Sequence, residues 1–325
     1  MNITIFGTGV YSLAIALQLA KKENNKIIMW TENEDTLEIF NKTHRLPMLF
    51  DIKIPNNIIL TTNYEDAMKK TELIFFITSA KYLSDVCSNI KNYYNSSIPT
   101  CIASKGIENN TCEMLSNIVK RSLNTRNVSV ISGPTFAIDL INNEPCGLAI
   151  AGLNKNTINI VKNTLENESL KLRRSSDIIG IQICGSIKNI IAIAAGILKG
   201  LGYSESTQAF LINESLHDIK NIIYYLGGKK KTILTYAGIG DLLLTCTSTK
   251  SRNFSFGYVI GSTKNKKSIQ SYLESNTVEG YYTLHSVHKL LNLKGINMEL
   301  IELIYDIVVN YENPEKLATF LINKA

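Results

Sequence analysis

Short runs of β-branched and other apolar residues alternate with amphipathic stretches through the first half of the chain. Runs of this length predict buried strands, and the helical periodicity between them predicts helices that lead from one strand to the next. Such alternation is typical of an α/β protein with a doubly wound sheet. The predicted strands cover residues 3–6, 27–30, 58–61, 73–77, 100–103, 128–132 and 148–151.

The pattern changes near residue 178, beyond which the strand-like runs disappear and long apolar-periodic stretches take over. This change predicts a second domain that is all helix. A chain of 325 residues is long enough for two domains, which is the default for this length. We expect a sheet domain over residues 1–177 and a helical domain over residues 178–325, with punctuation at Gly196, Gly200, Gly202, Gly227 and Gly228.

The segment 178–198 has the length and apolar character of a membrane span. Lys188 and Asn189 lie in its middle, however, and a lysine at the centre of a lone span is costly. We therefore favour a buried helix whose lysine amine faces a polar cavity, and keep the membrane span as the alternative.

Composition changes this picture little. Hydrophobic residues make up 45% of the chain and charged residues 19%, as in an ordinary globular protein. The net charge of +6 suits an anionic small substrate as well as nucleic acid, so charge alone decides nothing. The short lysine groups at residues 229–231 and 264–267 are interpreted as solvated loops.

The six cysteines form no CxxC motif and no metal-like pairing with the four histidines, which favours reduced structural thiols and predicts no metal site. Gly7 and Gly9 interrupt the apolar N-terminus, and neither a basic region nor a cleavage site flanks it. We expect a cytoplasmic protein.

The first motif is Gly7-Thr8-Gly9-Val10-Tyr11-Ser12, which follows a predicted strand and opens a helix predicted over residues 11–22. In a Rossmann-type domain the first two glycines allow a tight turn and let the backbone approach a pyrophosphate, whose charge meets the helix N-terminus. Ser12 replaces the third glycine, but serine is small enough for close packing between strand and helix. The motif predicts dinucleotide binding, against the alternative of a plain strand-turn-helix.

Glu32 follows the second predicted strand, in the region where an acidic residue would contact the ribose hydroxyls of NAD. An arginine would instead accept the 2′-phosphate of NADP. Glu32 therefore favours NAD, although a solvated loop residue fits the sequence equally well.

Three further clusters have compositions unusual for simple connections: Ser104-Lys105-Gly106, residues 132–137, and residues 238–241 continuing to 251–253. The first two directly follow predicted strands. The carboxyl ends of strands border the ligand crevice of an open α/β sheet, so Lys105, Gly133 and Thr135 are expected near a ligand. Turn chemistry is the alternative for each cluster taken alone.

Together these segments resemble the bacterial-type NAD(P)-dependent glycerol-3-phosphate dehydrogenase family, from residue 2 to about residue 320. The resemblance rests on the three clusters, on residues 185–196 around Lys188, and on Glu279-Gly280. It implies a Rossmann domain for NAD or NADP, a helical substrate-binding domain, and interconversion of dihydroxyacetone phosphate with sn-glycerol 3-phosphate for phospholipid synthesis. It also implies a homodimer, with neither nucleic acid nor an integral membrane segment involved.

The resemblance further implies that Lys188 is catalytic and exchanges the hydroxyl proton. A carbonyl that receives a hydride becomes an alkoxide, and burial lowers the pKa of a lysine toward a useful range; a structural buried ion pair is the alternative. The positions expected to bind the cofactor are Gly7, Gly9, Val10, Tyr11, Glu32, Lys105, Ala137, Arg252 and Glu279. The positions expected to bind the substrate are Lys105, Gly133, Thr135, Lys188, Asp241, Ser251, Arg252 and Asn253.

The chain departs from the family pattern between residues 206 and 218. Glu214-Ser215 replaces the usual Arg-Gly, and Ser206 stands where asparagine is common. If the arginine supports the site electrostatically, Glu214 reverses the local charge and slows turnover. Two alternatives to the main hypothesis therefore stay open: a related dehydrogenase for another small oxo acid or phosphate ester, and a catalytically weakened nucleotide-binding or regulatory protein.

Overall fold

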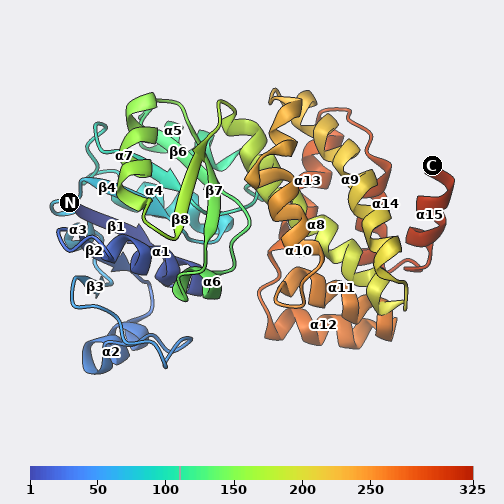
Figure 1. Cartoon of the computed structure of the whole chain (residues 1–325), viewed down its shortest axis with the longest axis horizontal. Coiled ribbons are helices and arrows are strands. Elements are labelled where there is room, and N and C mark those ends of the chain that lie inside the picture. Colours follow the sequence, from blue (N-terminus) through green and yellow to red (C-terminus); the bar gives the residue numbers. More distant parts are fainter. Residues whose placement is uncertain (110, 325) are drawn as a thin grey trace. The chain divides into compact units, whose positions relative to one another are not determined.

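The computed structural model describes residues 1–109 and 111–324, which form two compact units. The first unit contains an eight-stranded sheet in the order β3-β2-β1-β4-β5-β6-β7-β8 (Figure 1). The strands are β1 (Asn2–Phe6), β2 (Lys26–Trp30), β3 (Ile58–Thr61), β4 (Leu73–Phe76), β5 (Thr100–Ile102), β6 (Val128–Ser132), β7 (Cys146–Gly152) and β8 (Leu170–Arg174). All seven predicted strands are present, and the prediction of a doubly wound sheet is confirmed.

The strand order reverses between β1 and β4, both of which pair in parallel with their neighbours. In sheets of this kind ligands bind at the carboxyl ends of the strands beside this reversal, and β1 leads directly into the glycine turn. All four residues of β4 are buried, which explains why the central strands read as continuous apolar runs. The sheet thus brings the glycine motif to the position where ligands are bound.

The eighth strand was missed because its sequence looks unlike the others. In β8, Leu170 and Leu172 are buried while the lysine and arginines between and after them are exposed. Charged residues are common on an edge strand, where they discourage pairing with other chains. The strand β7 runs back along β6, since Gly152 lies beside Val128 and the Leu153 amide donates to the Val128 carbonyl at 2.9 Å.

The helices of the first unit form two groups. Helix α1 contacts α6 and α7, whereas α4 contacts α3 and α5. Right-handed crossovers that proceed in opposite directions from β1 and β4 place helices on opposite faces of the sheet. The helices are α1 (Val10–Ala20), α2 (Glu34–Thr43), α3 (Tyr64–Met68), α4 (Leu83–Ile90), α5 (Leu115–Ser122), α6 (Ala137–Ile141) and α7 (Lys155–Leu165), with the short turn η1 (Ala80–Tyr82) before α4.

Every element of secondary structure described beyond residue 177 is a helix or a short helical turn, as predicted. The helices are α8 (Ile178–Gly200), α9 (Glu205–Tyr225), α10 (Asp241–Cys246), α11 (Arg252–Thr263), α12 (Lys266–Ser275), α13 (Glu279–Leu293), α14 (Glu299–Val308) and α15 (Lys316–Lys324). Two short turns, η2 (Lys230–Leu234) and η3 (Tyr236–Gly240), precede α10.

Helix α8 is the one described helix that is long and apolar enough to cross a membrane, by length and composition. In the structure 89% of its most apolar window is buried inside the protein. Its apolar surface is therefore covered by neighbouring helices, as the buried-helix interpretation expects.

The second unit also includes two segments from the first half of the chain, Lys105–Met114 and Ser132–Pro134. The main division between the units falls between Ile178 and Ile179. Because of these two earlier segments, however, one boundary along the sequence cannot separate the units completely. The Ser286 hydroxyl on α13 donates to the Asn109 side chain at 2.7 Å and ties the first of these segments to the helical unit.

The interpretation of Gly196 as punctuation is wrong, because this residue lies inside α8. A side chain at Gly196 would come within 2.0 Å of the Phe254 carbonyl oxygen, and one at Gly257 within 1.9 Å of the Ile193 carbonyl oxygen. These glycines allow the backbones of α8 and α11 to pack in direct contact. The close approach fixes α11, which begins at Arg252, against the helix that carries Lys188.

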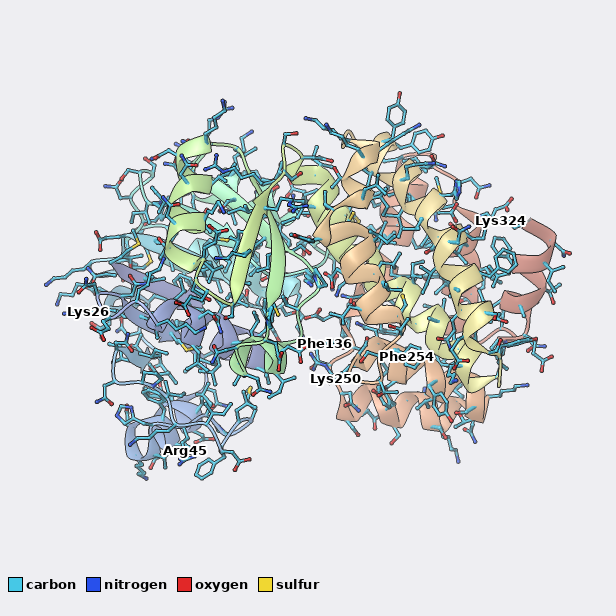
Figure 2. All side chains as sticks on the ribbon, viewed as in Figure 1. Lys26, Arg45, Phe136, Lys250, Phe254 and Lys324 are labelled. Carbon is cyan, nitrogen blue, oxygen red and sulfur yellow. The ribbon has the colours of Figure 1, made fainter. Side chains whose placement is uncertain are left out.

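A salt bridge links the last described helix, α15, to α9. The Lys324 ammonium donates to both carboxylate oxygens of Asp218, at 2.9 and 2.8 Å. Lys324 is labelled in Figure 2. Leu317 and Leu321 of α15 are buried alongside. The departures from the family pattern on α9 therefore lie on a helix that is packed on more than one side.

Candidate active site

The turn after β1 has the geometry that a dinucleotide needs. Gly7 has φ +127°, and a side chain there would lie 2.9 Å from the Ile77 carbonyl oxygen, so only glycine fits. Gly9 precedes α1 in extended conformation, and a side chain there would meet nothing within 4 Å. The turn therefore requires glycine at position 7 and leaves open space beside Gly9.

The N-terminus of α1 carries neither a side-chain cap nor an acidic residue in its first turn. Its first amide groups therefore have no acceptor from a capping side chain, and an anion at this position would be stabilised by them and by the helix dipole. Ser12 is buried, and its hydroxyl lies 3.4 Å from the Ile77 carbonyl oxygen. The serine is accommodated without opening the turn.

Two further predicted residues lie next to this turn in the first unit. The Tyr11 hydroxyl is 3.1 Å from the Thr135 hydroxyl, and Ala137 begins α6, which packs on α1. Thr135 was expected at the substrate, but the structure groups it with the cofactor candidates Tyr11 and Ala137. Gly133, by contrast, belongs to the second unit.

The end of β2 is polar and acidic. The Thr8 hydroxyl donates to the Thr31 hydroxyl at 3.1 Å, which links the glycine turn to the residue just after β2. Glu32 is exposed, and Glu34 and Asp35 follow in the first turn of α2. No lysine or arginine occurs between Thr31 and Asn41, so the residues just after β2 offer three carboxylates, Glu32, Glu34 and Asp35, and no cation.

The central feature of the second unit is a buried carboxylate shared by two lysines. The Lys188 ammonium donates to Asp241 Oδ1 at 2.5 Å, and the Lys105 ammonium donates to Asp241 Oδ2 at 2.7 Å. Lys188 is 7% exposed and Asp241 is 1% exposed. With both lysines protonated the three groups carry one net positive charge, which suits a ligand or an intermediate that is negative.

Thr245 completes the coordination of Lys188. Its hydroxyl oxygen accepts a hydrogen bond from the Lys188 ammonium at 2.8 Å and its proton is donated to the Asp241 carbonyl oxygen at 2.6 Å. Sequence reasoning missed this buried residue. The signal was present, because a position four residues after Asp241 lies on the same face of a helix.

The pKa of Lys188 is lowered to about 8, chiefly because the ammonium is buried; the Asp241 carboxylate opposes this shift and the nearby Lys105 adds to it. Water solvates an ammonium far better than the protein interior does, so burial favours the neutral amine. A lysine with this pKa can both give and take a proton near neutral pH.

The position of Asp241 is set by the turn before it. Gly238, inside η3, has non-helical backbone angles of φ −87° and ψ −110°, and a side chain there would come within 2.1 Å of the Ile233 carbonyl oxygen. This close approach requires glycine, and α10 begins shortly after it at Asp241. The kink at Gly238 thus sets the direction in which α10 starts.

The Ser251-Arg252-Asn253 segment divides into one exposed and two buried residues. Ser251 caps α11 by accepting from the Phe254 amide at 3.3 Å, and Asn253 Oδ1 accepts from the Gly280 amide at 2.8 Å. Both thus hold the fold together in addition to any role at a ligand. The Arg252 side chain is exposed, so its guanidinium has direct access to solvent.

Glu279 lies at the first position of α13, and the Asn189 amide of α8 approaches its carboxylate at 3.5 Å. A side chain at Gly280 would lie 2.7 Å from the Asn189 carbonyl oxygen. The Glu279-Gly280 motif therefore brings α13 against the residue that follows Lys188. The structure connects three of the predicted clusters here, those of Lys188, Asn253 and Glu279.

The hydroxyl of Ser132 is a second feature that sequence reasoning missed. This oxygen is buried with no hydrogen-bond partner, and it faces Gly185, one helical turn before Lys188. A side chain at Gly185 would lie 2.8 Å from the Ser132 oxygen and 3.7 Å from Lys105 Cγ. The absence of a side chain at Gly185 lets Ser132, α8 and the Lys105 side chain come together within the second unit.

The helical unit also contains a largely apolar cavity of about 820 Å³ between α9, α10 and α11, lined by residues such as Ile212, Leu243 and Phe254. None of the predicted site residues lines it. Glu214 is half-buried on α9 and does not line the cavity either. This cavity and the lysine–aspartate cluster are therefore separate features of the helical unit.

A doubly wound sheet with a glycine turn after its first strand, together with a helical unit that holds a buried lysine–aspartate cluster, defines a two-domain nicotinamide-dependent dehydrogenase. Models of the N-terminal and C-terminal parts of NAD-dependent glycerol-3-phosphate dehydrogenase match residues 2–158 and 177–319. The chain belongs to this family.

Individual relatives agree over nearly the whole length. Glycerol-3-phosphate dehydrogenase (NAD(P)+) of Staphylococcus aureus (strain bovine RF122 / ET3-1) is 32% identical over 317 residues, which cover 96% of this chain and 94% of the relative. The enzyme of the same name from Thermoanaerobacter sp. (strain X514) is 30% identical, covering 100% and 97%. The crystal structure of glycerol-3-phosphate dehydrogenase from Coxiella burnetii superposes with a TM-score of 0.92 at 27% identity, covering 99% and 98%.

Proposed function

We propose that this protein reduces dihydroxyacetone phosphate to sn-glycerol 3-phosphate with NADH or NADPH, and that Lys188 supplies the proton. The observation that carries the proposal is the buried Lys188–Asp241–Lys105 cluster in a chain of this family. The family model and the relatives' names support the reaction, and the cluster supports the assignment of its chemistry.

The glycine turn fits a dinucleotide. Gly9 leaves open space beside an uncapped helix N-terminus, where the pyrophosphate would be held by the first amides of α1. When bound, the nicotinamide supplies the hydride. The side chains of Tyr11, Thr135 and Ala137 stand beside the turn and would border the cofactor in the first unit.

Lys188 is placed to act as the general acid of the reduction. The substrate carbonyl oxygen gains negative charge as its carbon is reduced, and the Lys188 ammonium would donate a proton to that oxygen. Asp241 and Thr245 hold the ammonium in position, which lowers the entropic cost of the transfer. Lys105 shares Asp241 and adds a second positive charge beside the developing alkoxide.

Arg252 is the candidate for the substrate phosphate. Its exposed guanidinium offers a planar set of donors that matches two phosphate oxygens at once. Ser251 and Asn253 flank it on α11, and the Ser251 hydroxyl keeps a proton to donate while its oxygen caps the helix. Gly133 would contribute its backbone, as the resemblance implies.

NAD is the expected cofactor of the two. Glu32 is exposed beyond β2, where its carboxylate would accept hydrogen bonds from ribose hydroxyls. The 2′-phosphate of NADP would instead lie near the carboxylates of Glu32, Glu34 and Asp35, and these like charges would repel it.

The alternative of a weakened regulatory protein finds no support in the cluster itself. The changes at Glu214 and Ser215 leave Lys188, Lys105 and Asp241 in contact with one another. Ser215 is buried and donates to the Ile212 carbonyl at 2.7 Å within its own helix. Ser215 is thus accommodated within α9, and the contacts of the lysine–aspartate cluster are kept.

The test is oxidation of NADH and of NADPH by the full chain, with dihydroxyacetone phosphate in one series and a small 2-oxo acid of similar size in the other. We expect turnover with the phosphate ester, and faster turnover with NADH. Turnover only with the oxo acid would replace the substrate, and cofactor binding without turnover of either would overturn the proposal.

Two finer points are also proposed, from the family resemblance: a homodimer in solution and residence in the cytoplasm. Sedimentation at micromolar concentration should give twice the chain mass of 36.2 kDa, and cell fractionation should recover the protein with the soluble fraction at moderate salt. A monomer, or an extracted integral membrane protein, would contradict them.

A further inference from the structure

One exposed surface of the helical unit combines positive charge with exposed apolar groups. It lies where α9 ends and continues through η2. We name it the lysine–tyrosine patch; it consists of Tyr224, Tyr225, Lys229, Lys230, Lys231 and Leu234.

The apolar members are unusually open to solvent. Leu234 is 76% exposed, and Tyr224 and Tyr225 are 58% and 59% exposed. Single exposed apolar residues are ordinary, but several gathered on one short segment are not. No other large hydrophobic residue in the described part of the chain is as exposed as Leu234.

The patch is held in shape from beneath. Thr232 and Ile233 of η2 are buried, whereas the lysines just before them and Leu234 just after them are exposed. The Lys230 ammonium lies 4.4 Å from the centre of the Tyr224 ring, and the Tyr224 and Tyr225 rings meet edge to face at 6.0 Å. The Lys230 side chain of η2 thus lies against the Tyr224 ring near the end of α9.

The charge of the segment is of one sign. Residues 219–240 include four lysines and no aspartate or glutamate. The segment therefore contributes positive charge and no negative charge of its own. In the other lysine group, Lys264 pairs with Glu315 at 2.6 Å.

We propose that the lysine–tyrosine patch binds the surface of an anionic lipid bilayer. Lysines are attracted to anionic headgroups, tyrosine rings favour the boundary between headgroups and acyl chains, and an exposed leucine enters the apolar layer. Nucleic acid would use the lysines and could stack on the tyrosines, but gains nothing from an exposed aliphatic side chain. Leu234 therefore favours the membrane as partner.

The test is co-sedimentation of the full chain, without substrate or cofactor, with vesicles of phosphatidylglycerol and phosphatidylcholine or of phosphatidylcholine alone. We expect binding to the anionic vesicles only, weakening as salt increases. The triple variant Lys229→Gln, Lys230→Gln, Lys231→Gln should partition about a hundredfold less, at roughly fivefold per lysine. Leu234→Ser should weaken the binding that persists at high salt.

The matched control is the triple variant Lys264→Gln, Lys266→Gln, Lys267→Gln, which changes the net charge by the same amount and should bind like wild type. The proposal is overturned if wild type does not sediment with anionic vesicles, if both triple variants lose binding equally, or if single-stranded RNA binds the patch and vesicles do not. The dehydrogenase assay on the same variants should be unchanged, so failure of the membrane proposal and failure of the proposed function are separate results.

Discussion

The glycine turn of the sheet unit and the lysine cluster of the helical unit prepare for anions in opposite ways. The turn does so by lacking side chains, since Gly7 permits a positive φ and Gly9 leaves open space before α1. The cluster does so with three charged groups, the buried Lys188 and Asp241 and the partly buried Lys105. Backbone amides need no titration, whereas the charge of the cluster depends on pH.

The two regions should therefore respond differently to substitution. Adding atoms to the turn should damage binding or folding according to the space at each glycine. Removing atoms from the cluster should damage proton transfer and leave the cofactor in place.

Replacing Lys188 should have the largest effect. Lys188→Ala should lower kcat for dihydroxyacetone phosphate reduction by about 10²–10⁴-fold because the proton donor is lost. Binding of NADH, followed by its fluorescence, should change little. The matched control is Lys199→Ala on the same helix, which removes a half-exposed lysine paired with Glu205 and should keep kcat within about twofold. Full activity of Lys188→Ala would remove this residue from the mechanism.

The two glycines of the turn should separate folding from binding. Gly7→Ala should lower the free energy of unfolding by about 2 kcal/mol, because alanine is strained at φ +127° and its side chain meets the Ile77 carbonyl. Gly9→Ala should leave that free energy unchanged but weaken NADH binding at least about tenfold, since a methyl group enters the space for the pyrophosphate. Urea denaturation and NADH titration measure the two quantities. Normal NADH affinity in Gly9→Ala would place the cofactor elsewhere.

The cluster should show itself in the pH dependence of the two reaction directions. Reduction needs the protonated Lys188, whose pKa burial lowers to about 8, so kcat should be level below pH 8 and fall about tenfold per pH unit above it. Oxidation of glycerol 3-phosphate needs the neutral amine and should rise up to about pH 8. Asp241→Asn removes the neighbouring negative charge, so both limbs should move to lower pH. Profiles that stay in place would argue against Lys188 as the titrating group.

Cofactor choice should respond to Glu32 alone. Glu32→Arg should shift the ratio of kcat/KM for NADPH over NADH upward by about tenfold, because a guanidinium replaces a carboxylate where the 2′-phosphate would lie. Glu23→Arg, which makes the same change at an exposed residue of the turn before β2, is the control and should leave the ratio unchanged. Equal efficiency of wild type with both cofactors would refute the role of Glu32.

The smallest effect is expected at Glu214. Restoring the usual arginine with Glu214→Arg should change kcat/KM by less than about threefold, because Glu214 is half-buried on α9 and screened by solvent. A gain of tenfold or more would show that this position acts on the site electrostatically. Steady-state kinetics at low and moderate salt distinguishes the two results.

The sequence itself predicted most of the fold. Alternating runs revealed seven strands, and the change of period near residue 178 revealed the helical domain, because burial of apolar faces leaves a repeating pattern in the chain. The strand β8 was missed because Lys171 and the arginines beside it interrupt that pattern. Gly196 was misjudged because its role is contact with another helix, which no local pattern reveals.

The residue types that the chemistry requires can be read from the sequence: a glycine turn after a strand, a lysine inside an apolar helix, and short polar clusters in a fixed order. Which of these residues meet became clear only from the folded chain. The fold brings Lys105 and Lys188 to the Asp241 carboxylate. It also places Thr245 within hydrogen-bond distance of Lys188, and Thr135 within hydrogen-bond distance of Tyr11. The physical reason is that a buried charge must find its partner in space, and residues 136 positions apart carry no local sign of that contact.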